Sequence, residues 1–248
     1  MDKQEHNEKT HFDHIASNYD TNYGYDKPYT NYKIDQKAYS FKECVSNYYK
    51  DKTITILEIG CGTGEYTGRI GKLLPKSKII GIDISSNVLK IAQRKMKIQN
   101  VIFKNASAYN IPLRNNSVDV VCAFYALHHL NSKKVLKEFS RVLKPGGVLY
   151  FYEPNILNPL VWLIKTIKPL KALIGDSPDE WGVNPLKIKT IYKDYSVMKM
   201  KFSGFVIPLY FIPPEFMKQL DRIFGITSII PLFKFVGGSI EVCLIKEK

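Results

Sequence analysis

The chain has 248 residues, of which 45% are hydrophobic and 24% are charged. This composition is typical of a globular protein and excludes disordered, collagen-like and solenoid classes. No run reaches the ~18–20 uninterrupted apolar residues of a membrane span, and the polar N-terminus lacks the apolar segment of a secretory signal. We therefore expect a cytoplasmic protein, at most peripheral at the inner membrane face. Four dispersed cysteines without metal-ligand spacing agree with a reduced protein: Cys44, Cys61, Cys122 and Cys243.

Lysine and arginine number 36 against 23 acidic residues, which gives a formal net charge of +13. The excess positive charge falls on stretches whose spacing suits a helix, such as Lys90–Lys97 and Lys133–Lys137. We expect these side chains on the solvent-exposed faces of helices. Charge alone admits nucleic acid or anionic lipid as a partner. Because no arginine stripe interleaved with aromatic residues is present, we expect no specific nucleic-acid partner.

Between residues 53 and 153, short apolar runs rich in β-branched residues alternate with helical patterns. This alternation predicts a doubly wound α/β fold, with a mostly parallel seven-stranded sheet and an antiparallel edge strand. Helices are expected around Ile70 and behind the caps Ser85 and Asn131. The predicted strands are Thr53–Ile59, Lys78–Ile84, Val101–Phe103, Val118–Phe124 and Val148–Glu153.

We expect one domain over residues 1–248, in four parts. Residues 1–50 form a helical N-terminal cover and residues 51–153 the ligand-binding core. Residues 154–190 form an insertion on the substrate side, and residues 191–248 complete the sheet. The cover has helical stretches around His11–Tyr19 and Asp35–Tyr48, and the last part has a strand, a helix and a strand: Tyr195–Phe205, Pro213–Phe224 and Ser239–Ile245.

A glycine-rich loop, Gly60–Cys61–Gly62–Thr63–Gly64, joins the first predicted strand to a helix. Such glycines let the backbone approach a ligand closely, beside the free N–H groups of a helix start. A dinucleotide fingerprint needs glycine at the sixth position, which is Glu65 here, and Glu58 would repel phosphate. Asp83, at the end of the second strand, can accept hydrogen bonds from both hydroxyls of a ribose. The pattern favours a nucleoside ligand without phosphates.

With these features the sequence resembles the class I S-adenosylmethionine-dependent methyltransferases that carry an E-x-G-x-G-x-G loop. The resemblance covers about residues 12–153 and rests on five elements in order. They are the glycine loop, Ile111–Leu113, Asn116–Val121, Leu127–Leu130 and Leu143–Gly147. It implies S-adenosylmethionine as cofactor, methyl transfer as the reaction, and no metal.

The resemblance also implies a set of cofactor-binding residues. The three loop glycines would pack against the methionine part, Glu58 would orient the loop and the ligand's amino group, and Asp83 would hold the ribose. Tyr19 would close the site. The full expected set is Tyr19, Glu58, Gly60, Cys61, Gly62, Gly64, Asp83, Ile84, Ser107, Ala108 and Phe124.

One position departs from the family pattern. The family usually has Gly-Asp-Ala where this chain has Ala106–Ser107–Ala108. The aspartate of that pattern accepts a hydrogen bond from the adenine amino group, and the Ser107 hydroxyl can do so only more weakly. The adenine contact is therefore expected to differ in this chain.

Methyl transfer requires the protein to position the acceptor and, for an oxygen or nitrogen acceptor, to remove one proton. We expect His129 to be the general base, with Glu153 and His128 as the other candidates. A structural role is an alternative for each, since His129 could cap a helix and Glu153 could bind the insertion. The adjacent histidines would face opposite sides of a strand.

Residues 158–171 combine Trp162, an apolar face and a lysine at every third position (Lys165, Lys168 and Lys171). This pattern predicts either an interfacial helix with weak membrane contact or packing on the core or a second copy. With the apolar runs Phe205–Phe211 and Ile226–Phe235, it favours a small or lipid-like acceptor, such as a prenyl or acyl lipid, a quinone precursor or a lipid-linked sugar. The alternatives are an RNA or protein methyltransferase and a catalytically silent cofactor-binding module.

Overall fold

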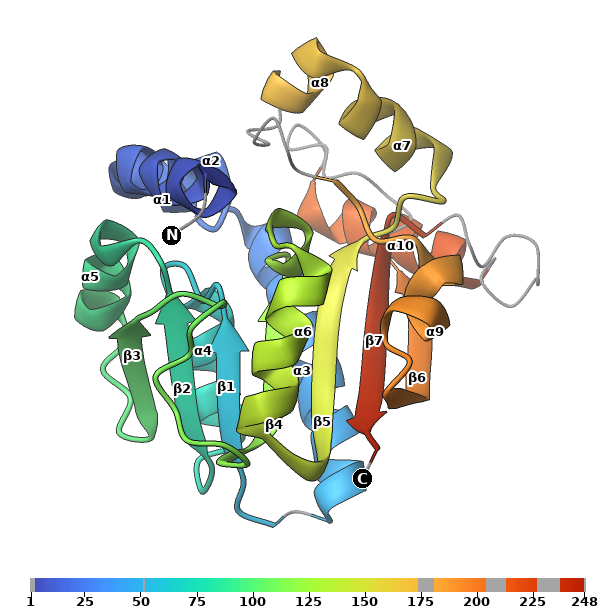
Figure 1. Cartoon of the computed structure of the whole chain (residues 1–248). Helices are drawn as coiled ribbons and strands as arrows, with labels where there is room; N and C mark the ends of the chain where they lie inside the picture. The colour runs from blue at the N-terminus through green and yellow to red at the C-terminus, as the bar shows by residue number, and fades with distance from the viewer. Residues whose placement is uncertain (1–2, 51, 174–180, 204–212, 227–236, 248) are drawn as a thin grey trace.

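The structure is a computed structural model that describes residues 3–50, 52–173, 181–203, 213–226 and 237–247. Its seven-stranded sheet has the order β3-β2-β1-β4-β5-β7-β6 (Figure 1). Strands β1 to β5 are parallel, and β7 runs antiparallel to its neighbours β5 and β6. The doubly wound, mostly parallel seven-stranded sheet is thus confirmed, and its antiparallel strand, β7, lies next to the edge strand β6. The strands are β1 (Thr55–Ile59), β2 (Lys78–Asp83), β3 (Val101–Asn105), β4 (Val118–Phe124), β5 (Leu143–Pro154), β6 (Tyr195–Ser203) and β7 (Ser239–Lys246).

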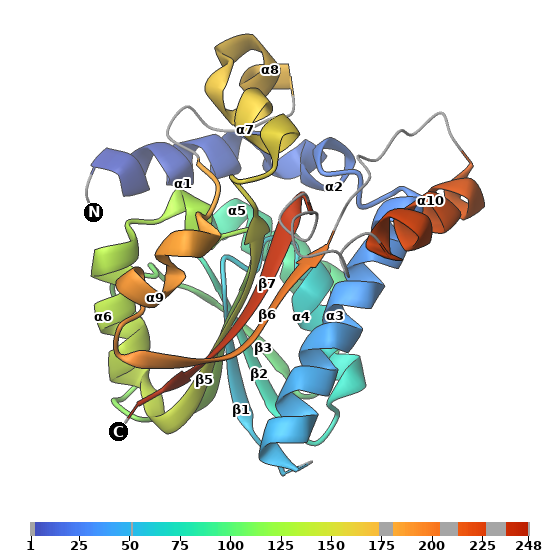
Figure 2. The same cartoon turned by 90° about the vertical axis from the view of Figure 1, so that its right-hand side faces the viewer.

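Helices cover both faces of the sheet and the edge where the parallel strands end. Helices α3 and α4 lie on one face and α6 and α9 on the other, while α1, α2, α7 and α8 lie beyond the carboxyl ends of the strands (Figures 1 and 2). The helices are α1 (Lys3–Ile15), α2 (Tyr19–Asn22), α3 (Pro28–Tyr49), α4 (Glu65–Leu73), α5 (Ser86–Lys95), α6 (Ser132–Val142), α7 (Pro159–Thr166), α8 (Lys168–Leu173), α9 (Ile188–Ile191) and α10 (Pro214–Ile226).

Local sequence signals account for where several elements begin. The Ser85 hydroxyl accepts the backbone N–H of Val88 at 3.2 Å and begins α5, and the Asn131 side chain caps α6 in the same way, as their sequence positions predict. Strand β5 begins at Leu143 rather than Val148, because Leu143 already pairs with β4 before an irregularity in the register.

Two apolar cores lie on opposite faces of the sheet. Residues of α6 and α9, including Phe139 and Ile188, pack on one face. Residues of α3 and α4, including Phe41 and Ile70, pack on the other. This burial of strands on both faces explains the near-continuous apolar runs of the parallel strands. It holds the strand ends, and therefore the loops that follow them, in fixed positions.

Helix α7 is oriented differently from the expectation of an exposed lysine row. Trp162 is 50% exposed, whereas Lys165 and Lys171 are buried. The prediction that these two lysines face a membrane surface is therefore wrong: Lys165 of α7 lines a cavity, and Lys171 is buried on α8. The side chain of Lys168 and the apolar runs Phe205–Phe211 and Ile226–Phe235, except for the helical end residue Ile226, lie outside the described residues. No helix within the described ranges is long and apolar enough to cross a membrane.

Candidate active site

A cavity of about 470 Å³ opens where the parallel strands end, between the glycine loop, α1 and α7. Nine of the residues expected from the sequence line it: Tyr19, Gly60, Cys61, Asp83, Ile84, Ala108, Phe124, His128 and His129. Five others do not form part of its lining: Glu58, Gly62, Gly64, Ser107 and Glu153. The structure thus brings most of the predicted set to one place and places the rest around it.

The glycine loop has no room for side chains at any of its three glycines, since even at Gly64 a Cβ atom would lie 2.9 Å from the ring of Phe103. A Cβ atom on Gly60 would lie 2.7 Å from the Cβ of Ala126. A Cβ atom on Gly62, whose φ is +53°, would lie 2.7 Å from the hydroxyl oxygen of Tyr19. All three distances are shorter than real contacts allow, so only glycine fits. Burial also raises the pKa of the Cys61 thiol well above its usual value, which keeps that side chain neutral.

Asp83 connects the glycine loop to the turn after β2. Its carboxylate accepts the backbone N–H of Gly62 and that of Ser85, each at 2.9 Å. Burial raises the pKa of Asp83, although these hydrogen bonds oppose the shift. A carboxylate has about four acceptor positions, so the same group that fixes the loop can also accept the two hydroxyls of a ribose.

Glu58 lies outside the cavity lining and is almost completely buried. The hydroxyl of Thr67, on α4, donates a 2.6 Å hydrogen bond to its carboxylate. Burial raises the pKa of Glu58 from 4.5 to about 8. In this structure Glu58 fixes the start of α4 relative to β1, which corresponds to the loop-orienting part of its expected role.

The two adjacent histidines have different partners because they lie in a turn, not on a strand. Strand β4 ends at Phe124, and a 3-10 turn over Leu127–His129 follows. The imidazole of His128 is paired with the carboxylate of Glu153, which also accepts the backbone N–H groups of Ala126 and Leu127. Glu153 is fully buried and so holds this turn rather than facing the cavity.

His129 faces the cavity and the N-terminal cover. Its Nδ1 atom lies 3.1 Å from a carboxylate oxygen of Glu8, and its ring meets that of Phe12 edge to face at 5.5 Å. The backbone oxygen of His129 accepts a 2.9 Å hydrogen bond from Gln4. Glu8 therefore places a negative charge beside one ring nitrogen of His129, at the edge of the cavity that His129 lines.

Helix α1 supplies two cavity-lining carboxylates that the sequence analysis did not single out. Glu5 and Glu8 are both largely buried, and Glu5 accepts a hydrogen bond from the Ser107 hydroxyl. Asp13, further along α1, accepts a 2.6 Å hydrogen bond from Ser85. These contacts join residues distant in sequence, so no local spacing marks them.

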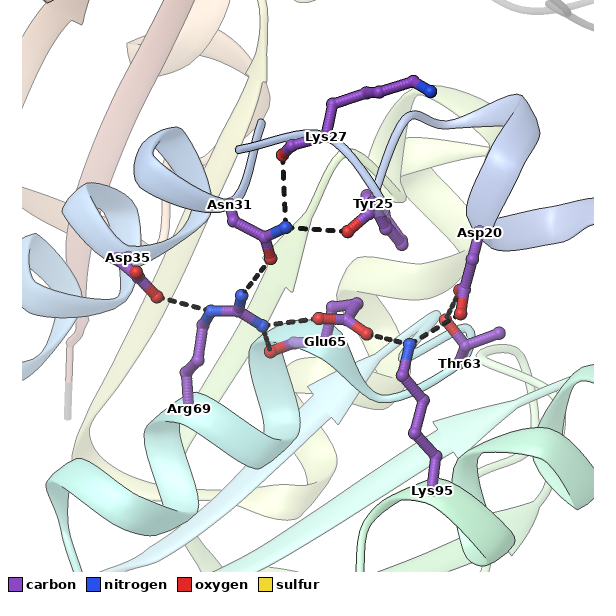
Figure 3. Close-up of polar contacts among 9 residues, drawn as sticks. All are labelled: Asp20, Tyr25, Lys27, Asn31, Asp35, Thr63, Glu65, Arg69 and Lys95. Atoms are coloured by element: carbon purple, nitrogen blue, oxygen red, sulfur yellow. Dashed lines mark hydrogen bonds and ion pairs between the residues drawn. The ribbon is translucent and has the colours of Figure 1, made fainter. Parts of the chain in front are cut away.

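A network of charged side chains holds the N-terminal cover against the glycine loop (Figure 3). Glu65, at the start of α4, pairs with Arg69 at 2.5 Å and with Lys95. Arg69 continues to Asp35 of α3, and Lys95 pairs with Asp20 of α2 at 2.6 Å. Asp20 also accepts a 2.6 Å hydrogen bond from Thr63 in the loop, so the cover and loop are positioned together.

Aromatic and apolar side chains form much of the cavity wall. Tyr66 stacks on Phe124 with ring centroids 4.2 Å apart, and Tyr23 and Tyr25 pack with Tyr19. Helix α7 adds Val161, Ile164 and Lys165, while Tyr125, Pro154 and Ser239 complete this part of the wall. Among the described residues, no group of three or more His, Cys, Asp or Glu side chains is placed to hold a metal ion.

Known proteins with similar sequences and folds define the family. Residues 57–151 match the family described as a methyltransferase domain. The chain is 30% identical over 211 residues to an uncharacterized protein of Methanocaldococcus jannaschii, covering 80% of this chain and 76% of that protein. It is 29% identical to the demethylmenaquinone methyltransferase of Lactiplantibacillus plantarum, covering 66% of this chain and 72% of the relative. Several other curated methyltransferases are matched over only 39% to 61% of their length.

The fold is shared with the magnesium protoporphyrin IX methyltransferase of Synechocystis, solved with bound S-adenosylhomocysteine, at a TM-score of 0.68 and 12% identity. That alignment covers 99% of this chain and 100% of the other. The chain belongs to the class I S-adenosylmethionine-dependent methyltransferases, and S-adenosylmethionine is its cofactor. The residues present fit this cofactor, since Gly60 and Asp83 both line the cavity and the Asp83 carboxylate can accept the hydroxyls of a ribose.

Proposed function

We propose that the protein methylates a small amphiphilic acceptor with an aromatic ring, of the quinone-precursor kind. The observation that carries this proposal is the aromatic and apolar part of the cavity wall, formed by Tyr66, Phe124, Tyr125 and the inner side of α7. Flat apolar rings stack favourably on such a wall. The demethylmenaquinone methyltransferases among the relatives support the same acceptor class.

When bound, S-adenosylmethionine supplies a methyl group on a positively charged sulfur. We propose that Asp83, Gly60 and Ile84 hold this cofactor at the strand ends. The chain then has to orient the acceptor, exclude water and remove a proton. His129 takes the proton in this proposal, because it lines the cavity and has the carboxylate of Glu8 beside its Nδ1 atom. The acidic side chains of α1 and the loop also suit a ligand that carries positive charge.

The test is an acceptor panel with S-adenosylmethionine labelled in its methyl group. It contains a demethylated naphthoquinol with a short prenyl tail, the same tail without the ring, a polar amine, bulk RNA and unfolded protein. We expect label on the naphthoquinol alone, and none when Asp83→Ala replaces the wild-type protein. Labelling of only RNA, protein or the polar amine would overturn the proposed acceptor class.

A further inference from the structure

Ser107 follows β3 and does not itself line the cavity. Its hydroxyl donates a hydrogen bond to Glu5 of α1 and accepts one from the backbone N–H of Tyr109 at 3.0 Å. Glu5 does line the cavity and is only 9% exposed. A carboxylate from the N-terminal helix is therefore held in front of the serine.

The surroundings of Glu5 suit the far end of a nucleoside. In the sheet, β3 lies beside β2 and β2 beside β1, so a ligand crossing their ends passes the glycine loop, Asp83 and then the loop after β3. Ile84, Val88, Ala106 and Ala108, which lie on the segments that follow β2 and β3, line the same cavity with apolar surface. This order of surfaces matches a ribose followed by a flat heterocycle that presents a hydrogen-bond donor at its edge.

We infer that Glu5 accepts the hydrogen bond of the adenine amino group, and that Ser107 is its positioning residue. A carboxylate has about four acceptor positions, so Glu5 can keep the hydrogen bond from Ser107 and also accept one from the amino group. The helix α1 thereby supplies the acidic group that the core loop of this chain lacks. The inference depends on S-adenosylmethionine binding, which the wild-type titration tests separately.

The inference predicts a specific discrimination between bases. An adenine amino group donates to a carboxylate, whereas the carbonyl oxygen of hypoxanthine at that position is an acceptor and would be repelled. A glutamine at position 5 can accept from the amino group or donate to the carbonyl. Glu5→Gln should therefore remove most of the preference for adenine, which a loss of helix docking alone would not do.

The experiment is calorimetry with S-adenosylhomocysteine and with its inosine counterpart. For S-adenosylhomocysteine, Glu5→Ala should weaken binding by about 10- to 150-fold, the range for a lost hydrogen bond to a charged group. Glu5→Gln should bring the affinities for the two ligands to within about threefold of each other. Glu8→Gln, a matched change on the same helix, should keep the wild-type ratio of affinities.

A double variant tests the placement of the carboxylate. Ser107→Asp in the Glu5→Ala background puts an acidic group on the core loop and should recover most of the lost affinity. Ser107→Asp alone places two carboxylates together and should weaken binding. The inference would be overturned if Glu5→Gln keeps the wild-type preference for adenine, or if the double variant binds no better than Glu5→Ala. Absence of binding to the wild-type protein would instead count against cofactor binding itself.

Discussion

The hydroxyl of Tyr19 fills the space beside the α-carbon of Gly62. A Cβ added to Gly62 would lie 2.7 Å from the Tyr19 hydroxyl oxygen and 3.1 Å from the carbon that bears it. Tyr19 belongs to the N-terminal cover and Gly62 to the glycine loop, and Asp83 fixes the loop through the Gly62 N–H. The cover can therefore close on the loop only while position 62 has no side chain.

We predict that Gly62→Ala weakens S-adenosylhomocysteine binding at least tenfold, because the added methyl displaces Tyr19 and strains the loop. Gly146→Ala is the matched control, since Gly146 also has a positive φ but its Cβ would lie 3.8 Å from the nearest atom, the Tyr48 hydroxyl. Each change should cost about 1–2 kcal/mol of folding stability for the left-handed backbone. Thermal unfolding and calorimetry measure both effects. Equal ligand affinity in the two variants would contradict the prediction.

The different partners of the two histidines predict different effects of their removal. His128→Ala leaves Glu153 fully buried without its imidazole partner and should reduce the free energy of unfolding by about 3 kcal/mol. His129→Ala should change stability by less than about 1 kcal/mol but lower kcat by about 10²–10⁴-fold with the acceptor found in the panel.

The affinity for S-adenosylhomocysteine is the control measured for both histidine variants. His129→Ala should leave this affinity within about threefold of wild type. Chemical denaturation gives the stability, and single-turnover methyl transfer gives the rate. An active His129→Ala enzyme, together with a stable but inactive His128→Ala enzyme, would reverse the assignment of the base.

Much of the fold could be predicted because its signals are local. Apolar runs gave the parallel strands, and the bounds of β4 agree with those predicted, since a strand buried on both faces is nearly all apolar. The glycine loop is recognisable because it comes directly after a strand, and Asp83 because it ends the next strand.

The parts that could not be predicted depend on tertiary contacts. Glu5 meets Ser107 across 102 positions of the sequence, and no periodicity of α1 marks that pairing. The turn that holds His128 and His129 follows Tyr125, a non-glycine residue with a positive φ that no sequence pattern marks. The sequence pattern of α7 predicts an apolar face and a lysine face. It does not indicate that Lys165 lines a cavity or that Trp162 stays exposed.

The network around Glu65 predicts unequal effects for the two carboxylates that bind Arg69. Glu65 is 7% exposed and pairs with both Arg69 and Lys95, whereas Asp35 is 50% exposed. Glu65→Gln should lower the free energy of unfolding by about 3 kcal/mol, because it leaves partly buried positive charges without their partner. Asp35→Asn should cost less than about 1 kcal/mol. If denaturant titrations give similar losses of unfolding free energy for the two variants, then solvent screens the charges of the whole network.

The raised pKa of Glu58 predicts a pH-dependent stability whose sign follows from proton binding. Between pH 4.5 and about 8 the folded protein holds a proton on Glu58 that the unfolded chain has released. The free energy of unfolding contributed by this group therefore falls as pH rises through that window, by at most about 5 kcal/mol.

Glu58→Gln removes the ionisation and keeps an oxygen that can accept the Thr67 hydrogen bond. We predict that the variant and the wild type unfold at similar temperatures at pH 5, and that the variant becomes the more stable protein at pH 9. Each kcal/mol of difference corresponds to about 2–4 °C in a chain of this size. Because all other titrating groups are common to both proteins, the difference between their melting temperatures isolates Glu58. A difference that stays constant from pH 5 to pH 9 would show that Glu58 ionises in the folded protein as it does in the unfolded chain.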